Sequence, residues 1–342
     1  MAENIKERFN LITRNLQEVL VETELKDLLK KKNEISVYWG TMPTGSISVA
    51  YFFPMLKIAD FLKANLRVKI LIADLHAALD GVPWELLGKR TEYYKRAIIV
   101  ILKTIGVDTK KLEFIKGSDI QLNDKYFHHV LRLSTISSIN ECKKASSEVI
   151  KAKENPLLAG LIYPIMQALD EEYLNVDIQF AGLDQRKIMV FARENLPKIG
   201  FRPRIELMTP MIRGLVGEKM SSSVEATKID LLDNEETIFK KINKAECVEG
   251  DPNNGLLAML KYFIMPFKQD NDNKFVVERS DKFGGNVVYA NYEQIEKDFL
   301  AKKLHPLDLK KALANEMSKL LANFREDNQL KELHKEAYPI KR

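Results

Sequence analysis

The sequence predicts an α/β fold, in which a parallel sheet of the Rossmann type is followed by an all-helical domain. Short apolar runs alternate with segments whose apolar residues recur every three or four positions. This is the pattern of strands and helices in a parallel sheet. A Pro/Gly/Ser loop at 42–48 follows the first complete apolar run, and from Asp233 onward the pattern is mostly helical.

The expected strands are the short apolar runs at 35–40, 68–73, 112–115, 176–180 and 204–208. Residues 4–32 are expected to form helices, because Ile5, Phe9 and Ile12 recur at helical spacing. Pro83 suits a first helical turn. Further helices are expected over 49–64, 83–105 and 124–152. Another is expected to start at Asn155-Pro156, with Asn as the cap and Pro at the first position, and a last one at Asp184.

A composition shift near 225–235 marks the candidate domain boundary. We expect one domain over 1–228, with a helical insertion at about 118–160, and a helical domain over 229–342. A chain of 342 residues is long enough for two domains. The charged segment 327–342 is expected to be poorly ordered.

The composition is that of an ordinary globular protein, with 45% hydrophobic and 30% charged residues. No apolar run reaches the roughly 18 residues of a membrane span, and the polar N-terminus lacks the apolar core of a signal peptide. Cys142 and Cys247 have no metal-ligand spacing. These features favour a reducing, cytoplasmic setting, and the net charge of +5 is compatible with a polyanionic partner.

The loop Pro43-Thr44-Gly45-Ser46-Ile47-Ser48 lies between an expected strand and an expected helix. Ligands of doubly wound sheets bind at the carboxyl ends of strands, where the free N–H groups of a helix favour phosphate. Taken alone, the loop is better explained as a plain strand-to-helix turn, because short Gly/Pro loops are common in α/β proteins.

A second loop reads Lys219-Met220-Ser221-Ser222-Ser223 and is flanked by glycines. Lysine supplies a positive charge, while hydroxyl and amide groups supply donors, so the segment can fold over a triphosphate. The alternative is a serine-rich surface loop.

One expected helix carries a polar stripe of Tyr163, Gln167 and Asp170. Spacings of four and seven place these side chains on one face, where they can recognise a small polar ligand. A solvated helix face is the alternative. Gln185 follows the strand at 176–180, and a fourth polar group at a strand's carboxyl end favours a binding site.

The segments PTGSISVAY, ADLHAAL, YPIMQALDEEY, GLDQRK and GEKMSSS occur in this order. In this combination the chain resembles the tyrosyl-tRNA synthetases of the archaeal and eukaryotic kind, from about residue 10 to residue 326. The resemblance implies a class I enzyme with a Rossmann-type catalytic domain and a helical anticodon-binding domain. It also implies a homodimer, with L-tyrosine, ATP and tRNA(Tyr) as substrates and Mg²⁺ accompanying ATP. No residues suggest a dedicated metal site.

The resemblance also assigns residues to the tyrosine. Tyr38 and Asp170 would hold the phenolic hydroxyl, and Tyr163, Gln167 and Gln185 the α-amino group. His76 would line the site, although a structural core histidine is equally compatible with its position. Gly40 would let the backbone approach the substrate.

For ATP, the resemblance assigns the ribose hydroxyls to Asp184 and the charge developing on the pyrophosphate to Lys219. The other expected contacts with ATP are Pro43, Thr44, Gly45, Ser48, Met220, Ser221, Ser222 and Ser223. The catalytic pair would be Lys219 and Ser48.

The chain departs from the family at Ser48. Members usually carry a histidine here that contacts the reacting phosphates, whereas this chain reads Ser48-Val49-Ala50-Tyr51. Serine donates one hydrogen bond and carries no charge. Losing such a donor costs roughly 3 kcal/mol in a comparable oxyanion site, and we expect another group to compensate.

For tRNA, the resemblance places Lys143, Lys144 and Arg186 near the acceptor stem. It places Phe283, His305 and Asp308 in the anticodon-reading patch. Without the family, the lysines would be solvated, Phe283 would be a core residue and Asp308 a helix start.

Two other functions are compatible with these motifs. One is a tryptophanyl-tRNA synthetase, which Tyr38 and Asp170 argue against because both suit a phenol. The other is a catalytically weakened RNA-binding relative, which Ser48 favours. A chain ending at Arg342 is also expected to lack the C-terminal appendage of some animal members.

Overall fold

The computed structural model describes residues 2–149, 157–217 and 228–339, and the chain forms two compact units. The first, which we call the sheet unit, comprises Met1–Thr44, Lys57–Lys95 and Val107–Met211. The second, the helical unit, comprises Gly45–Leu56, Arg96–Gly106 and Ile212–Arg342. The domain boundary at residue 228 stays a prediction.

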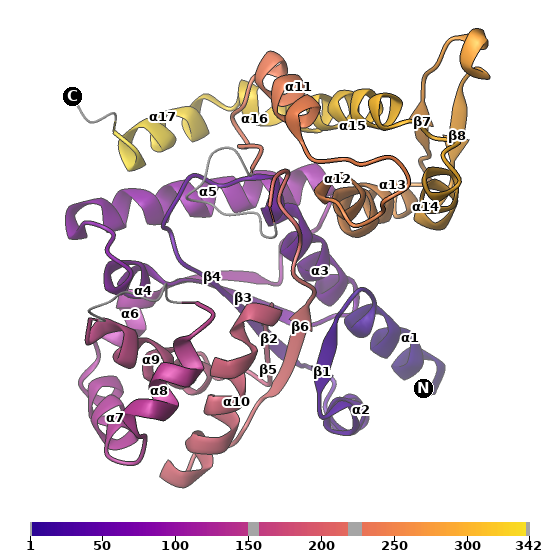
Figure 1. The fold of residues 1–342 in the computed structure, drawn as a ribbon. Coiled ribbons are helices and arrows are strands. Elements are labelled where there is room, and N and C mark those ends of the chain that lie inside the picture. Colours follow the sequence, from indigo (N-terminus) through magenta and orange to yellow (C-terminus); the bar gives the residue numbers. More distant parts are fainter. Residues whose placement is uncertain (1, 150–156, 218–227, 340–342) are drawn as a thin grey trace. The chain divides into compact units, whose positions relative to one another are not determined.

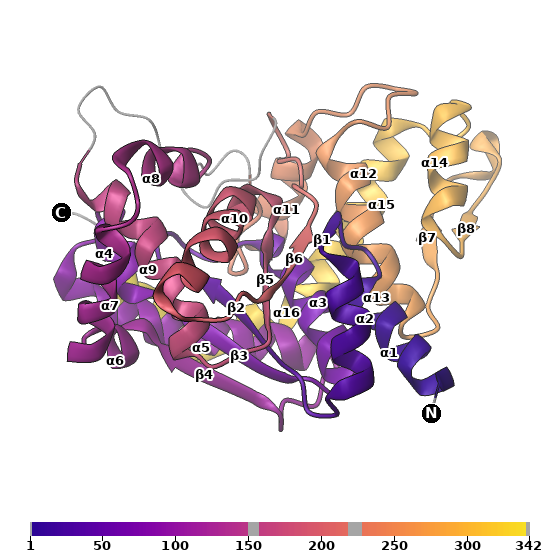
Figure 2. The ribbon, with the colours of Figure 1, turned by 90° about the horizontal axis from the view of Figure 1, so that it is seen from below.

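Six strands of the sheet unit form one sheet in the order β1-β6-β5-β2-β3-β4 (Figures 1 and 2). Their bounds are β1 Glu18–Leu20, β2 Ser36–Thr41, β3 Arg67–Ile72, β4 Leu112–Lys116, β5 Ile178–Gly182 and β6 Ile205–Thr209. All neighbouring strands are parallel except β1 and β6. The predicted α/β fold is confirmed, and only the short edge strand β1 was not expected.

Strand register decides which side chains share a face. Tyr38 of β2 pairs with Gln179 of β5, and the next pair along is Trp39 with Phe180. Because successive side chains point to opposite faces, Tyr38 and Gln179 share one face and Phe180 lies on the other. Phe61 packs edge-on against Phe180, with ring centroids 5.1 Å apart, so the helix of Phe61 covers the face opposite Tyr38.

The helices before α11 have the following bounds: α1 Ala2–Thr13, α2 Glu22–Lys31, α3 Phe52–Lys63, α4 Asp74–Leu79, α5 Leu87–Ile105, α6 Gly117–Gln121, α7 Asp124–Ser134, α8 Ile139–Ser146, α9 Ala159–Tyr173 and α10 Arg186–Asn195. Helix α9 packs against α7, α8 and α10 around a shared apolar cluster. The expected helix start at Asn155-Pro156 lies outside the described residues, and the described helix α9 begins at Ala159.

The helical unit contains α11 Glu235–Lys244, α12 Gly255–Met259, a π-helical turn at Leu260–Ile264, α13 Met265–Gln269, α14 Tyr292–Leu300, α15 Pro306–Leu320, α16 Ala322–Glu326 and α17 Asn328–Ala337. Its core includes a stack of Phe52 on Phe263, with centroids 4.5 Å apart. A hairpin of β7 Phe275–Val277 and β8 Val287–Tyr289 was not expected. Within the described residues, no helix combines the length and apolar character needed to cross a membrane.

The C-terminal segment does not match the expectation of poor order. Residues 328–337 form α17, and the side chain of Asp327 caps its first turn by accepting from the Leu330 amide. Leu330 and Ala337 are fully buried. Composition misled the prediction because it does not show that these two apolar side chains are buried or that His334 and Tyr338 make polar contacts within the unit.

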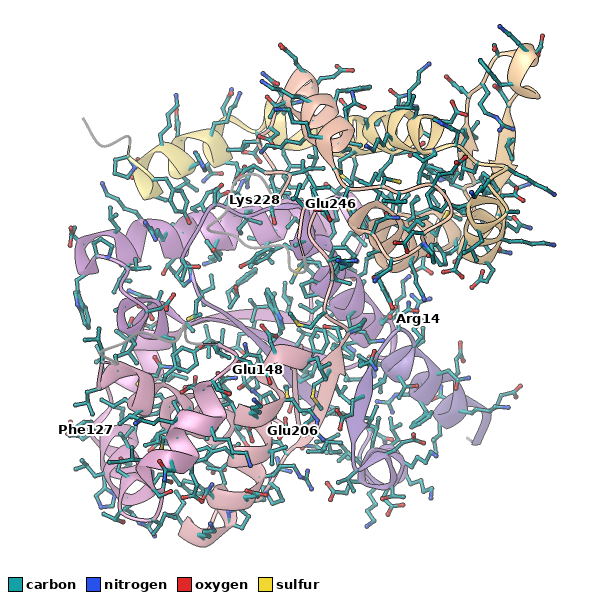
Figure 3. All side chains as sticks on the ribbon, viewed as in Figure 1. Arg14, Phe127, Glu148, Glu206, Lys228 and Glu246 are labelled. Atoms are coloured by element: carbon teal, nitrogen blue, oxygen red, sulfur yellow. The ribbon has the colours of Figure 1, made fainter. Side chains whose placement is uncertain are left out.

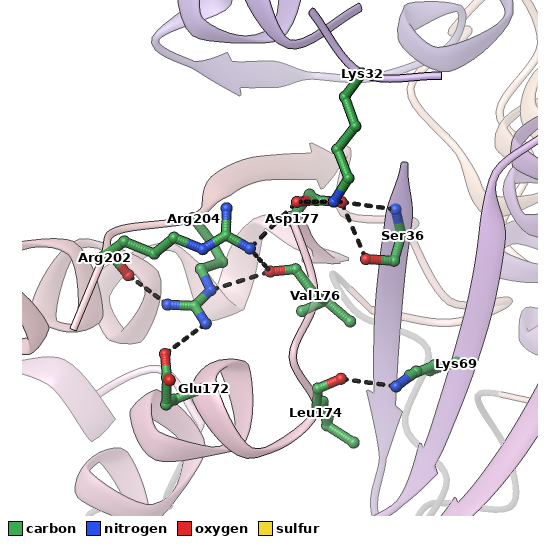
Figure 4. Close-up of polar contacts among 9 residues, drawn as sticks. All are labelled: Lys32, Ser36, Lys69, Glu172, Leu174, Val176, Asp177, Arg202 and Arg204. Atoms are coloured by element: carbon green, nitrogen blue, oxygen red, sulfur yellow. Dashed lines mark hydrogen bonds and ion pairs between the residues drawn. The ribbon is translucent and has the colours of Figure 1, made fainter. Parts of the chain in front are cut away.

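Asp177 ties the start of β2 to the start of β5 (Figure 4). Its carboxylate is buried and accepts from the Lys32 ammonium at 2.7 Å, the Ser36 amide at 2.9 Å and the Arg202 guanidinium at 3.2 Å. Burial opposes these hydrogen bonds, but together they hold the pKa of Asp177 below its usual value. The strands that carry Tyr38 and Gln179 are therefore joined by a charged contact as well as by their ladder.

We expect Asp177→Asn to lower the free energy of unfolding by about 1.5–3 kcal/mol, because hydrogen bonds from cations lose a charged acceptor. The lowered pKa means that the carboxylate stabilises the fold above the ordinary aspartate pKa. This contribution is lost as the pH falls through the folded-state pKa. The difference between wild type and variant should therefore shrink below about pH 4. Urea unfolding followed by tryptophan fluorescence measures it, with the buried Trp39 as one of the two reporters.

Asp27→Asn is the matched control, because Asp27 contacts Lys30 at 3.4 Å on an exposed helix face. An exposed pair contributes at most about 1 kcal/mol. Equal losses in the two variants, or a difference that does not depend on pH, would contradict the role of Asp177.

Candidate active site

Helix α9 carries the polar residues that were expected to bind a small ligand. Tyr163, Gln167 and Asp170 all lie on α9 within the sheet unit. Tyr163 and Asp170 are buried, at 4% and 1% exposure, and Gln167 is half-buried. The polar stripe is therefore part of the interior, and the prediction of a solvated helix face is wrong.

Asp170 is a buried carboxylate with two donors. Its Oδ1 accepts from the Gln121 amide at 2.8 Å and from the Tyr126 hydroxyl at 2.8 Å. Burial raises the pKa of Asp170 to about 7, although both hydrogen bonds act to lower it. In its charged form this carboxylate accepts hydrogen bonds, and any further donor that reaches Oδ2 would stabilise that form.

His76 lies against this carboxyl group. Its Nε2 is 4.0 Å from Asp170 Oδ2, and its ring packs edge-on against Tyr163 with centroids 4.6 Å apart. Burial lowers the pKa of His76 to about 4, although the nearby Tyr163 backbone acts to raise it, so the ring is neutral at pH 7. Nδ1 faces the Gln121 amide at 3.4 Å, whereas Nε2 has no hydrogen-bond partner among the residues that the structure describes. With Nδ1 as acceptor, Nε2 carries the proton and is a buried donor without a partner.

Tyr38 is 2% exposed and lies on the same side of the sheet as Gln179. Its hydroxyl is 2.7 Å from the Gln179 amide. Burial raises the pKa of Tyr38, and the nearby carboxylates, Asp170 among them, raise it further. Tyr38 therefore lies within electrostatic range of Asp170, but the hydrogen bond of its hydroxyl goes to a residue that sequence reasoning missed.

The residues expected to hold the amino group form a second polar pair. Gln167 on α9 donates to the Gln185 carbonyl at 3.2 Å, and Gln185 precedes the first residue of α10. The Tyr163 hydroxyl donates to the Met42 sulfur at 3.3 Å. A thioether is a weak acceptor, so this hydroxyl can exchange it for a better partner. The described structure thus brings together His76, Tyr163 and Asp170 on one side and Gln167 with Gln185 on the other.

Other expected contacts are placed individually. Gly40 is exposed near the end of β2, and a Cβ atom there would meet Tyr38 Cε2 at 3.6 Å, an ordinary contact. Asp184 follows β5 closely, and a Cβ atom at Gly182 would meet its carboxylate at 2.6 Å. Gly182 therefore leaves room for Asp184. In the sheet unit, Pro43 is buried and the Thr44 carbonyl accepts from Arg90.

The loop residues Gly45, Ser46 and Ser48 belong to the helical unit, where the C-terminal segment contacts Gly45 and Ser46. The Tyr338 hydroxyl donates to the Gly45 carbonyl at 2.7 Å, and His334 Nε2 lies 3.1 Å from the Ser46 hydroxyl. Ser48 is 3% exposed and caps the short helix Val49–Tyr51. The expected Lys219, Met220, Ser221, Ser222 and Ser223 lie outside the described residues.

The expected tRNA contacts are surface residues of the two units. Lys143 and Lys144 are exposed in the last turn of α8, and Arg186 makes a two-pronged ion pair with Glu18 at 2.7 and 2.9 Å. Phe283 is 66% exposed, so the alternative of a core residue was wrong.

In the helical unit, His305 caps α15 and Asp308 lies in its first turn. The ring nitrogen of His305 accepts from the Leu307 amide at 3.2 Å. The alternative reading of Asp308 as a helix-start residue is thus confirmed, and this position does not prevent a role in RNA contact.

Sequence reasoning missed Gln121, Tyr126 and Gln179. Gln121 ends the short helix that follows β4, so the rule that ligands gather at the carboxyl ends of strands could have found it. Tyr126 and Gln179 gave no such signal, because their partners are 44 and 141 residues away in sequence.

Comparison with known proteins places this arrangement in a family. A family model described as tRNA synthetases class I (W and Y) matches residues 30–322. Because this match covers most of the chain, the chain belongs to the class I tRNA synthetases of the tryptophan and tyrosine type.

Similar proteins in this family are tyrosine–tRNA ligases. The cytoplasmic tyrosine–tRNA ligase of Saccharomyces cerevisiae is 45% identical, over 98% of this chain and 88% of its own length. That of Gallus gallus is 51% identical, over 99% of this chain, but this chain spans only 64% of that relative. A crystal structure of tyrosyl-tRNA synthetase complexed with L-tyrosine from Archaeoglobus fulgidus is 38% identical, with a TM-score of 0.85. The likeness covers 98% of this chain and 100% of that one.

Proposed function

We propose that the chain is a tyrosine–tRNA ligase, which activates L-tyrosine with ATP and transfers it to tRNA(Tyr). The observation that carries the proposal is the buried Asp170, held by Gln121 and Tyr126 beside the unmatched Nε2–H of His76. The names of similar proteins support the same activity and a cytoplasmic location.

Tyr38 and Asp170 would bind the phenolic hydroxyl of the substrate. His76 Nε2, a donor without a partner among the described residues, lies 4.0 Å from Asp170 Oδ2. A ligand hydroxyl at this point would therefore meet an acceptor in Asp170 and a donor in His76. Phenylalanine would leave these buried polar groups unpaired, at about 1–3 kcal/mol for each group. Tyr163, Gln167 and Gln185 would hold the ammonium, because hydroxyl and amide oxygens accept its protons. An indole would offer no hydroxyl, which disfavours a tryptophanyl enzyme.

The chemistry has two steps. A carboxylate oxygen of tyrosine attacks the α-phosphorus of ATP, and the bond to the bridging oxygen of pyrophosphate breaks. A terminal ribose hydroxyl of the tRNA then attacks the tyrosyl carbonyl, and AMP leaves. Asp184 would bind the ATP ribose, and Pro43, Thr44, Gly45 and Ser48 would lie along the nucleotide. Lys219, with Met220, Ser221, Ser222 and Ser223, would neutralise the phosphates.

Magnesium would enter with the ATP phosphates. Throughout 2–149, 157–217 and 228–339, no group of three or more His, Cys, Asp or Glu side chains could hold a metal ion. We propose that the ion would enter with ATP as part of the substrate and would supply positive charge to its phosphates.

For tRNA, we propose that Lys143 and Lys144 contact acceptor-stem phosphates and that residues 229–342 bind the anticodon. Arg186 would contribute if tRNA phosphates compete with Glu18. Phe283, exposed beside Lys282, suits stacking on a base, and Asp308 can accept from a base edge.

The direct test is tyrosine-dependent exchange of pyrophosphate into ATP, with phenylalanine and tryptophan as controls. We expect exchange with tyrosine. With phenylalanine, kcat/KM should be at least about 100-fold lower, since more than one buried group loses its partner. Exchange driven best by tryptophan would favour the tryptophanyl alternative. A chain that binds tRNA but catalyses no exchange would favour the RNA-binding alternative.

Ser48 stands where the family usually has histidine. We propose that other cations compensate, and that Lys228 is one. Lys228 is 3% exposed, and its ammonium donates to the Ser46 carbonyl at 3.1 Å and lies 3.6 Å from the Asp230 carboxylate. Ser48→His should therefore change the exchange kcat by less than about tenfold. Restoring a missing donor worth roughly 3 kcal/mol would instead give more than a 100-fold gain.

Ser48→Ala serves as the control for this comparison, because it removes the hydroxyl that caps Val49–Tyr51 without adding a ring. A gain above 100-fold in Ser48→His alone would mean that the native chain lacks any compensating group.

A homodimer is proposed from the family and from an exposed apolar surface of the sheet unit. Its members are Leu122, Phe127, Leu131, Ile136 and Ile139, which are 39–72% exposed. Phe127 lies at the outer edge of its unit (Figure 3). Patches of this kind mark protein interfaces, and a second copy brings a matching apolar surface.

We expect Phe127→Asp to shift the chain from dimer to monomer in sedimentation velocity, because a buried unpaired charge is unfavourable at an apolar interface. Phe283→Asp is the matched control, since Phe283 is similarly exposed, at 66%, but lies outside this surface. A wild-type monomer, or a Phe127→Asp dimer of unchanged affinity, would contradict the proposed interface.

A further inference from the structure

Gln179 lies between the Tyr38 hydroxyl and two buried carboxyl groups. It is the β5 partner of Tyr38 in the β2–β5 ladder, and it is 2% exposed. The amide of Gln179 reaches Glu171 and Glu206, both of which are 0% exposed. Glu171 comes from α9 and Glu206 from β6, where Figure 3 labels it. One amide thus joins the proposed tyrosine-binding residue to an acidic pair behind it.

Hydrogen bonding fixes the orientation of this amide. A carboxylate only accepts hydrogen bonds, so the amide nitrogen of Gln179 faces the acids, 2.6 Å from Glu171 Oε1 and 3.1 Å from Glu206 Oε2. The amide carbonyl then accepts from the Tyr38 hydroxyl at 2.7 Å. The opposite orientation would press the carbonyl oxygen against two carboxyl groups.

The acidic pair keeps this orientation whether it holds a proton or not. Burial raises the pKa values of both Glu171 and Glu206, and the nearby Glu171 raises that of Glu206 further, while Arg204 and Arg193 oppose both shifts. Arg204 is itself buried and bonded to Glu172 at 2.6 Å. A protonated carboxyl group keeps its carbonyl oxygen as an acceptor, so both acids can accept from the Gln179 nitrogen in this orientation.

We propose that Gln179 is a positioning residue for tyrosine selection, whose side-chain carbonyl accepts the hydrogen bond of the Tyr38 hydroxyl and so fixes the direction of that hydroxyl. With its proton directed at Gln179, the Tyr38 oxygen faces a ligand as an acceptor. The phenolic proton of tyrosine is then shared between Tyr38 and Asp170, and phenylalanine has no proton to offer either. This inference rests on the proposed function, since it requires that Tyr38 meets the phenol of the substrate.

The alternative is that Gln179 serves only to satisfy Glu171 and Glu206. Both roles predict some loss of stability when the amide is removed, so stability cannot separate them. They differ in what happens once the Tyr38 hydroxyl is gone. A residue that acts through this hydroxyl has nothing left to position in a Tyr38→Phe background.

The test is a double-mutant cycle in full-length protein, with Gln179→Met, Tyr38→Phe and the double variant. The measurements are KM for tyrosine, KM for ATP, and the ratio of kcat/KM for tyrosine over phenylalanine in pyrophosphate exchange. We expect Gln179→Met to raise KM for tyrosine roughly five- to tenfold, the value of one hydrogen bond. KM for ATP should be unchanged, and the tyrosine-to-phenylalanine ratio should fall by a similar factor. In the Tyr38→Phe background, Gln179→Met should add less than about twofold.

The proposal is overturned if Gln179→Met raises KM for tyrosine as much in the Tyr38→Phe background as in the wild type. It is also overturned if Gln179→Met raises KM for tyrosine and KM for ATP by the same factor. If Gln179→Met unfolds, Gln179→Asn carries the same test, because its shorter amide can satisfy one acid without reaching Tyr38. Wild-type protein that shows no tyrosine-dependent exchange would refute the proposed function itself. Wild-type exchange with an additive cycle would refute only the role of Gln179.

Discussion

The structure depends on one constraint. Polar side chains that are buried against one face of the sheet must find hydrogen-bond partners inside the protein. Asp170, His76, Tyr38 and Gln179 are each no more than 2% exposed. Buried groups of this kind cost stability unless they are hydrogen-bonded. Most of them are matched by residues of other elements, and the His76 nitrogen that is not matched lies beside the carboxyl group of Asp170. A fold that leaves one donor open at this point is prepared for a ligand.

Two geometric periods bring these groups together. The strand period of two places Tyr38 and Gln179 on one face of neighbouring strands, and the helical period places Tyr163, Gln167 and Asp170 on one stripe of α9. The Asp177 contact, where Lys32, Ser36 and Arg202 meet, holds the starts of β2 and β5 in register. Because specificity relies on hydrogen bonds of about 3 Å, small shifts between these elements would matter.

Much of this arrangement could be predicted from local pattern. The five expected strands were placed within two residues, because each is a short apolar run bounded by turn residues. The stripe on α9 followed from spacing alone. Partners distant in sequence could not be predicted, since nothing local to Gln179 or Tyr126 indicates what lies opposite. Strand β1 and the hairpin β7–β8 are three-residue strands with too little pattern to detect. Helix α17 was missed because two buried side chains outweigh a charged composition. The motif at 219–223 lies outside the described residues, so its predicted role stays a prediction.

The central claim is that Tyr38 and Asp170 receive a phenolic hydroxyl, with Gln179 behind Tyr38. A crystal structure of the chain with bound L-tyrosine would test it most directly. The account predicts the phenolic oxygen within about 3 Å of both the Tyr38 oxygen and Asp170 Oδ2, with the Tyr38 hydroxyl still bonded to Gln179. A ring bound elsewhere, or a Tyr38 side chain turned away from it, would contradict the account.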